Sequence, residues 1–203
     1  MAPSAQIVTL PAMTLRIEQP HHYDPVGAVH RSAFGGQHGS TVAELVDALR
    51  RDDPAALSLV SEQAGEVVGH IMFSRALLDA PRQLVAVQSL SPLTVAPQWQ
   101  RRGIGSELIR GGLQRLDEGG IPLVFLEGDP GYYSRLGFSP AVEQGFRKPS
   151  LRIPDEAFQV VKLSAYEPWM VGTFVYSNIF WEHDCVGLRE ATHSDMGVLS
   201  GTE

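Results

Sequence analysis

One short segment limits what this chain can fold into more than any other: an apolar run, a turn at a proline and the start of a helix. It runs from Leu93 to Ser106 and reads LTVAPQWQRRGIGS. Its two glycines let the backbone come close to a ligand, and the free N–H groups at a helix start favour negative charge. Arg101 and Arg102 suit phosphate, because a planar guanidinium donates two parallel hydrogen bonds. The segment predicts a strand–loop–helix junction that binds a phosphate-bearing ligand.

The spacing of these glycines separates the junction from other nucleotide-binding loops. The chain contains 20 glycines, so a Gly-x-Gly pair alone arises readily by chance, and its place between a strand and a helix is what makes it informative. The sequence has no Gly-x-x-x-x-Gly-Lys-Ser/Thr loop, and Leu108 stands where a dinucleotide motif has its third glycine. A plain strand-to-helix connection with solvated arginines is the alternative.

Composition and charge narrow the class of protein. A chain of 203 residues is long enough for one large domain with a buried core. The 16 basic and 23 acidic residues give a formal net charge of −7, which argues against nucleic-acid binding and slightly favours a cationic substrate. The single cysteine, Cys185, allows no intrachain disulfide, and neither a signal peptide nor a membrane-spanning stretch is predicted. We therefore expect a cytoplasmic protein that binds neither nucleic acid nor membrane.

Hydrophobic periodicity predicts a mixed order of strands and helices. Predicted strands cover residues 14–18, 57–63, 67–74, 83–95, 123–126, 158–163 and 170–176. Predicted helices cover residues 26–34, a stretch that starts at 40 or 41, and residues 104–116, with a short helix between Asp129 and Gly137. This order is typical of an α/β or α+β domain, in which helices pack on a mixed sheet.

Glycine-rich and polar clusters predict the boundaries. The glycines at 35, 36 and 39 are expected to end one helix, and Ser40 or Thr41 to cap the next, with Glu44 completing a capping box. Over the whole chain we expect a flexible leader at residues 1–12, one domain over 13–180 and a partly disordered tail over 181–203.

A second motif lies one predicted strand beyond the first. Residues 127–138 read EGDPGYYSRLGF, in which Asp129-Pro130 predicts a helix start and Gly137 a left-handed helix end. At both motifs the chain resembles the GNAT superfamily of N-acetyltransferases: Gln-x-x-Gly-x-Gly after Leu-Thr-Val is similar to its acyl-CoA pyrophosphate loop, and Tyr-x-x-x-Gly-Phe to its second hallmark. The Gly-Asp-Pro form resembles the YhbS-type branch. The resemblance covers residues 14–176.

The resemblance implies a fold and a coenzyme site. A mostly antiparallel sheet of about seven strands would carry helices on both faces and splay apart between its fourth and fifth strands, with a bulge at Ser91-Pro92. Acetyl-CoA would lie with its pantetheine arm in the gap and its pyrophosphate on the helix start. The implied coenzyme-binding residues are Leu93, Thr94, Val95, Gln100, Arg101, Arg102, Gly103, Ile104, Gly105 and Ser106.

The resemblance also implies a general acid at Tyr133, because a phenol with a reference pKa of about 10 can protonate a departing thiolate. Glu127, at the end of its strand, is the candidate base or water-orienting group for an attacking amine. The alternatives are a packing aromatic for Tyr133 and a structural carboxylate for Glu127. Tyr132 and Phe138 are expected in the core.

Other polar residues are weaker candidates. His70 lies in a predicted strand, where its side chain either faces the acceptor or is simply packed. The adjacent His21 and His22 would point in opposite directions if extended, and no histidine spacing predicts a metal site. Cys185 lies outside both motifs, which favours direct transfer over an acyl-cysteine intermediate.

The resemblance implies an enzyme: an acetyl-CoA-dependent N-acetyltransferase that moves an acetyl group directly from the thioester to a primary amine of a small molecule, peptide or protein. Two alternatives are open: a non-catalytic acyl-CoA sensor or partner-binding module on the same fold, and an acyl-CoA hydrolase. Aromatic residues late in the chain are expected to pack in the core, shape the acceptor pocket or form a homodimer contact. They are Trp169, Phe174, Tyr176, Phe180 and Trp181.

Overall fold

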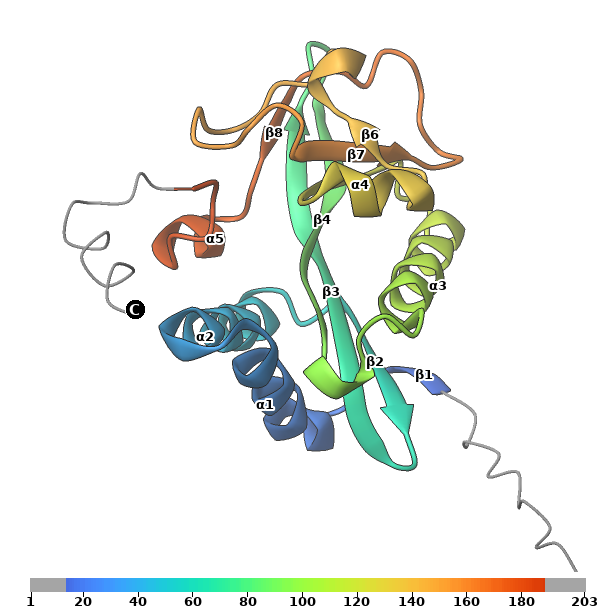
Figure 1. Cartoon of the computed structure of the whole chain (residues 1–203). Helices are drawn as coiled ribbons and strands as arrows, with labels where there is room; N and C mark the ends of the chain where they lie inside the picture. The colour runs from blue at the N-terminus through green and yellow to red at the C-terminus, as the bar shows by residue number, and fades with distance from the viewer. Residues whose placement is uncertain (1–13, 189–203) are drawn as a thin grey trace, which may run out of the picture.

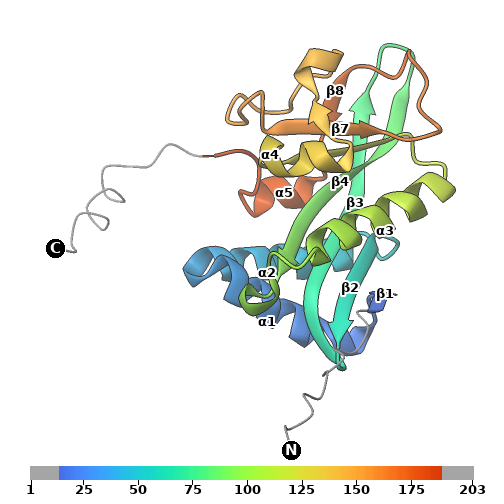
Figure 2. The same ribbon diagram turned by 45° about the vertical axis from the view of Figure 1, so that its right-hand side comes forward.

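The computed structural model describes residues 14–188, which form one sheet with helices on both faces (Figures 1 and 2). The predicted leader and residues 189–203 of the predicted tail lie outside the described residues. The strands are β1 (Thr14–Ile17), β2 (Leu57–Gln63), β3 (Glu66–Asp79), β4 (Leu84–Val95), β5 (Leu123–Glu127), β6 (Ser139–Pro140), β7 (Phe158–Lys162) and β8 (Thr173–Val175). The α-helices are α1 (Tyr23–Phe34), α2 (Gly36–Asp52), α3 (Ile104–Glu118), α4 (Pro130–Tyr133) and α5 (Asn178–Glu182). Short 3₁₀ turns are η1 (Pro20–His22), η2 (Pro97–Trp99), η3 (Ser134–Leu136) and η4 (Val142–Gln144).

The sheet has the predicted mixed character. Its strand order is β1-β2-β3-β4-β5-β7-β6, and β8 pairs with the far end of β3. Among the described strand pairs, β4–β5 is parallel and the others are antiparallel. The predicted fold class is therefore confirmed, with eight strands in place of about seven. β3 is longer than predicted, because its outer half pairs with β4 on one side and with β8 on the other.

Two apolar cores divide the helices between the faces of the sheet. Met72 belongs to the core beneath α1, α2 and α5, together with Leu49 and Phe174. The next residue, Phe73, belongs to the core beneath α3, together with Leu108. Successive residues of a strand point to opposite faces, so this one stretch of β3 serves both cores. Figure 1 shows α3 on the side of the sheet opposite α1 and α2.

Helix α3 follows the predicted periodic pattern. Its apolar positions Ile104, Leu108, Ile109 and Leu116 are all buried against the sheet. Close approach depends on Gly112, because a Cβ there would lie 2.2 Å from the Phe73 ring. The helix start that follows the glycine-rich loop is thereby held at a fixed place over the sheet.

The predicted start of the second helix is wrong. α2 begins at Gly36, so Ser40 and Thr41 lie inside it, and the Thr41 hydroxyl donates to the carbonyl of Gln37 at 3.2 Å. The chain turns at Gly35 and Gly36, whose φ values of 68° and 47° suit glycine. Gly39 stays helical because it packs against α1, where a Cβ would lie 2.9 Å from Arg31 Cα.

The predicted bulge and the predicted splay of the sheet are both present. Between β3 and β4 the register changes from Ile71–Leu93 to Phe73–Leu90, so β4 carries one extra residue at Ser91-Pro92. β4 and β5 pair at Gln88–Val124 and Ser89–Phe125 and at no later described position. Beyond Ser89, the edge of β4 that faces β5 is therefore without a partner strand.

The packed structure continues beyond the predicted domain boundary after residue 180, which falls inside α5. Phe180 and Val186 are buried in the same core as Phe174 and Tyr176. The side chains of Trp169 and Trp181 are more exposed, with Trp181 at 39%. Of the five late aromatic residues, three are thus buried in the core, and Trp169 packs against it. Within residues 14–188, no helix has the length and apolar character needed to cross a membrane.

Candidate active site

The loop between β4 and α3 presents unpaired N–H groups. The Gln100 amide donates to the carbonyl of Val95 at 3.1 Å and ties the loop to the end of β4. Arg101 and Gly103 have left-handed φ values of 59° and 86°. The first α-helical bond of α3 runs from the Glu107 N–H to the Gly103 carbonyl at 3.0 Å. The N–H groups between these two residues belong to the first helical turn, which has no carbonyl partner within the helix.

These N–H groups border a cavity of about 290 Å³, which we call the loop cavity. Every predicted coenzyme-binding residue lines it except Arg102. The Arg102 guanidinium lies 4.7 Å from the centre of the Trp99 ring. The lining residues are Leu93, Thr94, Val95, Trp99, Gln100, Arg101, Gly103, Ile104, Gly105, Ser106 and Tyr132. A cavity beside a helix start with an adjacent arginine is suited to an anionic group.

Tyr132 is a site residue that the sequence analysis placed in the core. It is half-buried and lines the loop cavity, and its hydroxyl lies 3.5 Å from the Ser106 hydroxyl. A Cβ on Gly105 would lie 2.7 Å from the Tyr132 oxygen. The close contact explains why glycine stands at this position. No local pattern in the sequence distinguishes which of the two adjacent tyrosines faces α3.

A second cavity of about 350 Å³, the central cavity, lies on the other side of Leu93, the residue that both cavities share. Glu127 and Tyr133, the two predicted catalytic residues, both line it. The remaining lining residues are Phe34, His38, Thr41, Val42, Leu45, Leu90, Ser91, Pro92, Tyr176, Asp184, Cys185 and Gly187. The structure thus brings the splayed strands, both sequence motifs and the last described residues to one place.

Tyr133 is positioned by the predicted short helix. Asp129 caps α4, with its Oδ1 accepting the Gly131 N–H at 2.8 Å. The Tyr133 ring packs edge-on against Phe138, which is buried as expected. A Cβ on Gly128 would lie 2.3 Å from the Tyr133 ring. Burial, and then the nearby Tyr132 and Asp129, raise the pKa of the Tyr133 phenol. The phenol is therefore protonated at neutral pH and can act as a hydrogen donor.

Glu127 ends β5 with its carboxylate held on both oxygens. Oε1 accepts the Tyr176 hydroxyl at 2.9 Å, and Oε2 accepts the Gly187 N–H at 3.0 Å. Burial raises the pKa of Glu127, while the two hydrogen bonds and the charge of Arg152 act in the opposite direction. A buried carboxylate whose pKa is raised is a better proton acceptor than an exposed one.

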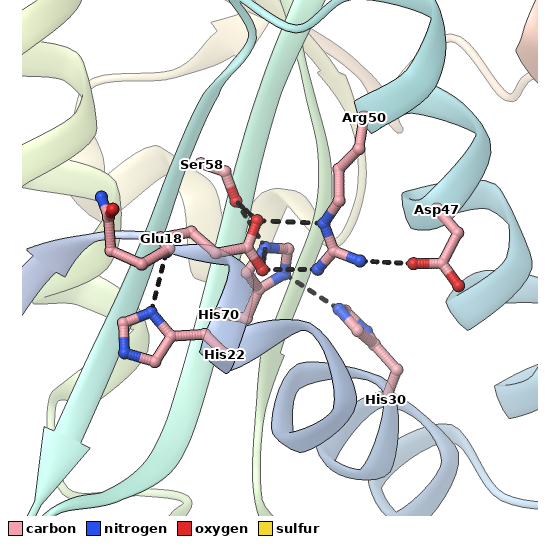
Figure 3. Close-up of polar contacts among 8 residues, drawn as sticks. Glu18, His22, His30, Asp47, Arg50, Ser58 and His70 are labelled. Carbon is pink, nitrogen blue, oxygen red and sulfur yellow. Dashed lines mark hydrogen bonds and ion pairs between the residues drawn. The ribbon is translucent and has the colours of Figure 1, made fainter.

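His70 does not line either cavity but lies in a buried polar chain (Figure 3). The Ser58 hydroxyl donates to the Glu18 carboxylate at 2.7 Å, so it accepts from the Nε2–H of His70 at 2.8 Å. His70 Nδ1 then accepts from His30 Nε2–H at 2.9 Å. Arg50 pairs with Glu18 at the other end. Burial is the largest cause that lowers the pKa of both histidines, to about 3 for His30. Of the two alternatives for His70, packing is the one observed.

His21 and His22 are not extended but lie in η1, so the divergence expected of an extended pair does not arise. Their ring centres are 3.9 Å apart, and with Glu62 they form a cluster of possible metal ligands. However, His22 Nδ1 accepts the Gln19 N–H at 2.9 Å, which puts the proton of the neutral ring on Nε2. That N–H faces Glu62 at 3.2 Å. The ring nitrogen that would ligate a metal is thus occupied by a proton and a hydrogen bond.

Cys185 lies in the lining of the central cavity, although it is outside both motifs. Its thiol donates to the His183 carbonyl at 3.3 Å. Burial, followed by the carboxylates of Asp184 and Glu127, raises the pKa of this thiol. A thiol that stays protonated is a poor nucleophile, so its surroundings do not favour an acyl-cysteine.

The sequence matches a known family over most of the described domain. The family described as "Acetyltransferase (GNAT) domain" matches residues 15–141. The chain is 36% identical over 152 residues to the uncharacterized N-acetyltransferase YjhQ of Escherichia coli K12, which covers 73% of this chain and 82% of YjhQ. It is 32% identical over 155 residues to the uncharacterized N-acetyltransferase YhbS of the same organism, which covers 75% of this chain and 88% of YhbS.

The fold is also similar to that of solved GNAT family structures. The structure of YhbS from Escherichia coli in complex with CoA has a TM-score of 0.75 at 30% identity, over 85% of this chain and 94% of that one. A GNAT family acetyltransferase from Brucella melitensis in complex with acetyl-CoA has a TM-score of 0.67 at 33% identity, over 83% of this chain and 98% of that one. The resemblance inferred from the two motifs is confirmed, and the chain belongs to the GNAT family of acetyltransferases.

Proposed function

We propose that this protein is an acetyl-CoA-dependent N-acetyltransferase that transfers the acetyl group directly from the thioester to a primary amine. The observation that carries the proposal is the junction at Leu93. There the loop cavity, with the free N–H groups of α3, meets the central cavity, which holds Glu127 and Tyr133. The CoA and acetyl-CoA complexes of the two solved relatives support the same co-substrate.

In this proposal the loop cavity takes the pyrophosphate of acetyl-CoA. The N–H groups at the start of α3 and the Arg101 guanidinium would donate to the phosphate oxygens. The pantetheine arm would pair with the free edge of β4 beyond Ser89, as an added strand does. It would then pass Leu93 and bring the thioester into the central cavity. A β4 backbone N–H near Leu93 would face the thioester oxygen and stabilise its charge in the transition state.

Glu127 and Tyr133 would move the two protons of the reaction. Glu127 takes a proton from the acceptor ammonium, and the free amine forms a C–N bond to the acetyl carbon. When the C–S bond breaks, Tyr133 donates its proton to the departing sulfur, and its phenolate then takes the second proton from the nitrogen of the new amide. Glu127 releases the first proton to solvent, so separate groups of one cavity handle the two protons that the nitrogen loses. Cys185 forms no covalent intermediate.

The acceptor would enter the part of the central cavity that α2 and the last described residues border. Phe34, Val42 and Leu45 give that part an apolar wall, and Glu127 and Asp184 give it negative charge. A small-molecule or peptide amine fits this chemistry, because an ammonium is attracted by the carboxylates while its carbon chain contacts the wall. The cytoplasmic location and the homodimer stay predictions.

The test is a thiol-release assay with acetyl-CoA against a panel of amines, amino acids, aminoglycosides, polyamines and peptides. The proposal expects CoA to appear only when an amine is present, together with the acetylated amine by mass spectrometry. CoA binding without release under any amine would favour the binding module instead. Release at an equal rate without amine would favour hydrolysis.

A further inference from the structure

We propose that the segment from Tyr176 to Gly187, which we call the C-terminal strap, completes the proton-accepting end of the site by holding Glu127 as a carboxylate in the central cavity. The strap lies beyond residues 15–141, the part that matches the family. Tyr176 and Gly187 are positioning residues in this account. The inference rests on the proposed function, because it assigns the strap a part in the same reaction.

The contacts on Glu127 come from two distant points of the chain. Tyr176 follows Glu127 by 49 residues and donates to Oε1, and Gly187 follows it by 60 residues and donates to Oε2. Each carboxylate oxygen thus has its own donor. One donor would leave the group free to rotate about its last bond, whereas two fix the plane of the carboxylate.

The strap is itself well fixed. Tyr176 is 6% exposed, and the centre of its ring lies 4.7 Å from the ring centres of both Phe174 and Phe180. Val186 is fully buried. At Gly187 the φ is 64°, and a Cβ there would lie 2.7 Å from Arg152 Cβ, so only glycine fits without strain. The N–H that reaches Glu127 is therefore set by backbone geometry.

The groups around Glu127 show why it needs these donors. Burial disfavours the charged form of a carboxyl group. The Arg152 guanidinium favours it from the loop before β7, but it also pairs with Asp184 of the strap at 3.3 Å. The titratable groups that share the cavity or act on Glu127 are His38 of α2, Tyr133 of α4, Arg152, and Tyr176, Asp184 and Cys185 of the strap.

This arrangement divides the site by function. The loop cavity, with both sequence motifs, provides the contacts for acetyl-CoA and contains no strap residue. The strap provides the two donors to Glu127 and four residues of the central cavity, Tyr176, Asp184, Cys185 and Gly187. Damage to the strap should therefore affect the amine half of the reaction and leave CoA binding intact. A carboxyl group that has become neutral cannot accept a proton from an ammonium.

The test is Tyr176→Phe, which keeps the buried ring and removes its donor. The matched control is Tyr166→Phe, because Tyr166 is half-buried, the Lys162 ammonium lies over its ring, and it lines neither cavity. For Tyr176→Phe, we expect the acid limb of kcat/KM for the amine to move up by about one pH unit. The KM for acetyl-CoA should stay within about twofold, as expected when ground-state binding is unchanged. The control should match the parent protein in both.

A readout independent of activity separates this inference from the proposed function. In protein labelled with ¹³C at glutamate carboxyl groups, the resonance lost in Glu127→Gln identifies Glu127, and its titration midpoint can be followed by NMR. We expect a higher midpoint in Tyr176→Phe and in Gly187→Ala than in the parent protein. An unchanged midpoint in a folded Tyr176→Phe variant would overturn the role of the strap, even in an active enzyme. A shifted midpoint in a protein without amine-dependent CoA release would support the role of the strap in holding Glu127 and reject the proposed transferase activity.

Discussion

The hydroxyl of Tyr132 lies 3.5 Å from the hydroxyl of Ser106, so the two sequence motifs meet in space at the first turn of α3. Ser106 belongs to the glycine-rich loop and Tyr132 to the segment that carries the candidate acid Tyr133. The meeting point is part of the loop cavity. Because the two motifs are in contact here, a substitution in one motif should shift side chains of the other.

Substitution at Gly105 should weaken acetyl-CoA binding at this meeting point. In Gly105→Ala the new Cβ would lie 2.7 Å from the Tyr132 oxygen, which has to move. The displaced atom ends a side chain, so the fold should survive. We expect the KM for acetyl-CoA to rise about tenfold, the effect of about 1.4 kcal/mol of lost binding. Gly119→Ala, at the far end of α3, is the control and should leave the KM unchanged.

The two adjacent arginines, Arg101 and Arg102, should contribute unequally to CoA binding. Arg101 lines the loop cavity, whereas the Arg102 guanidinium lies over the Trp99 ring. Arg101→Ala should therefore raise the Kd of CoA more than Arg102→Ala does. A charge-assisted hydrogen bond is worth about 1.5–3 kcal/mol, so we expect roughly a tenfold to hundredfold effect for Arg101. Calorimetry measures both, and equal small effects would show that the phosphates bind elsewhere.

Tyr133→Phe should slow the chemical step and spare binding. Its phenol has a raised pKa and is protonated at neutral pH, so it can protonate the departing sulfur. General acid catalysis contributes about 10²–10⁴-fold, and kcat should fall within that range with an unchanged KM for acetyl-CoA. Tyr132→Phe is the matched control and should change KM more than kcat. A Tyr133→Phe enzyme with the parent kcat would reassign Tyr133 to packing.

The buried histidine chain should make the fold sensitive to mild acid. Burial lowers the pKa of His70 well below 6.5, and that of His30 to about 3. Between the ordinary pKa of a histidine and its lowered pKa in the folded protein, the unfolded chain binds a proton that the folded chain does not. The contribution to the free energy of unfolding is therefore complete above about pH 6.5. It is lost as the pH falls, by up to about 1.4 kcal/mol per pH unit for each histidine.

Urea unfolding between pH 7.5 and pH 5 measures this dependence. The parent protein should lose stability steeply below pH 6.5, and His70→Gln should be less stable at pH 7.5 with a flatter pH dependence. His38→Gln changes an exposed histidine and should keep the slope of the parent. If His70→Gln and the parent protein have the same slope, the buried pair does not control the acid response.

The acetyl-CoA side of the site could be predicted from sequence because its signals are local. Pro97, Gly103 and Gly105 shape one short loop, and Asp129 caps the helix that begins at the next residue. Each of these residues determines the backbone conformation only of residues close to it in the sequence. The bulge at Ser91-Pro92 follows the same rule.

The hydrogen bonds that hold Glu127 and those of the buried histidine chain could not be predicted, because they join residues far apart in the chain. Tyr176 reaches Glu127 across 49 residues, and His30 reaches His70 across 40. A hydrogen bond of that kind leaves no periodicity or turn signal. The start of α2 failed for a related reason: the packing of Gly39 against Arg31 overrides the local tendency of glycine to end a helix.

A crystal structure of the protein soaked with acetyl-CoA tests the central claim most directly. The account predicts the diphosphate against the N–H groups from Arg101 to Ser106, with the pantetheine arm beside Leu93 and the thioester in the central cavity near Tyr133. Coenzyme bound elsewhere on the protein, or no coenzyme at millimolar concentration, would contradict it.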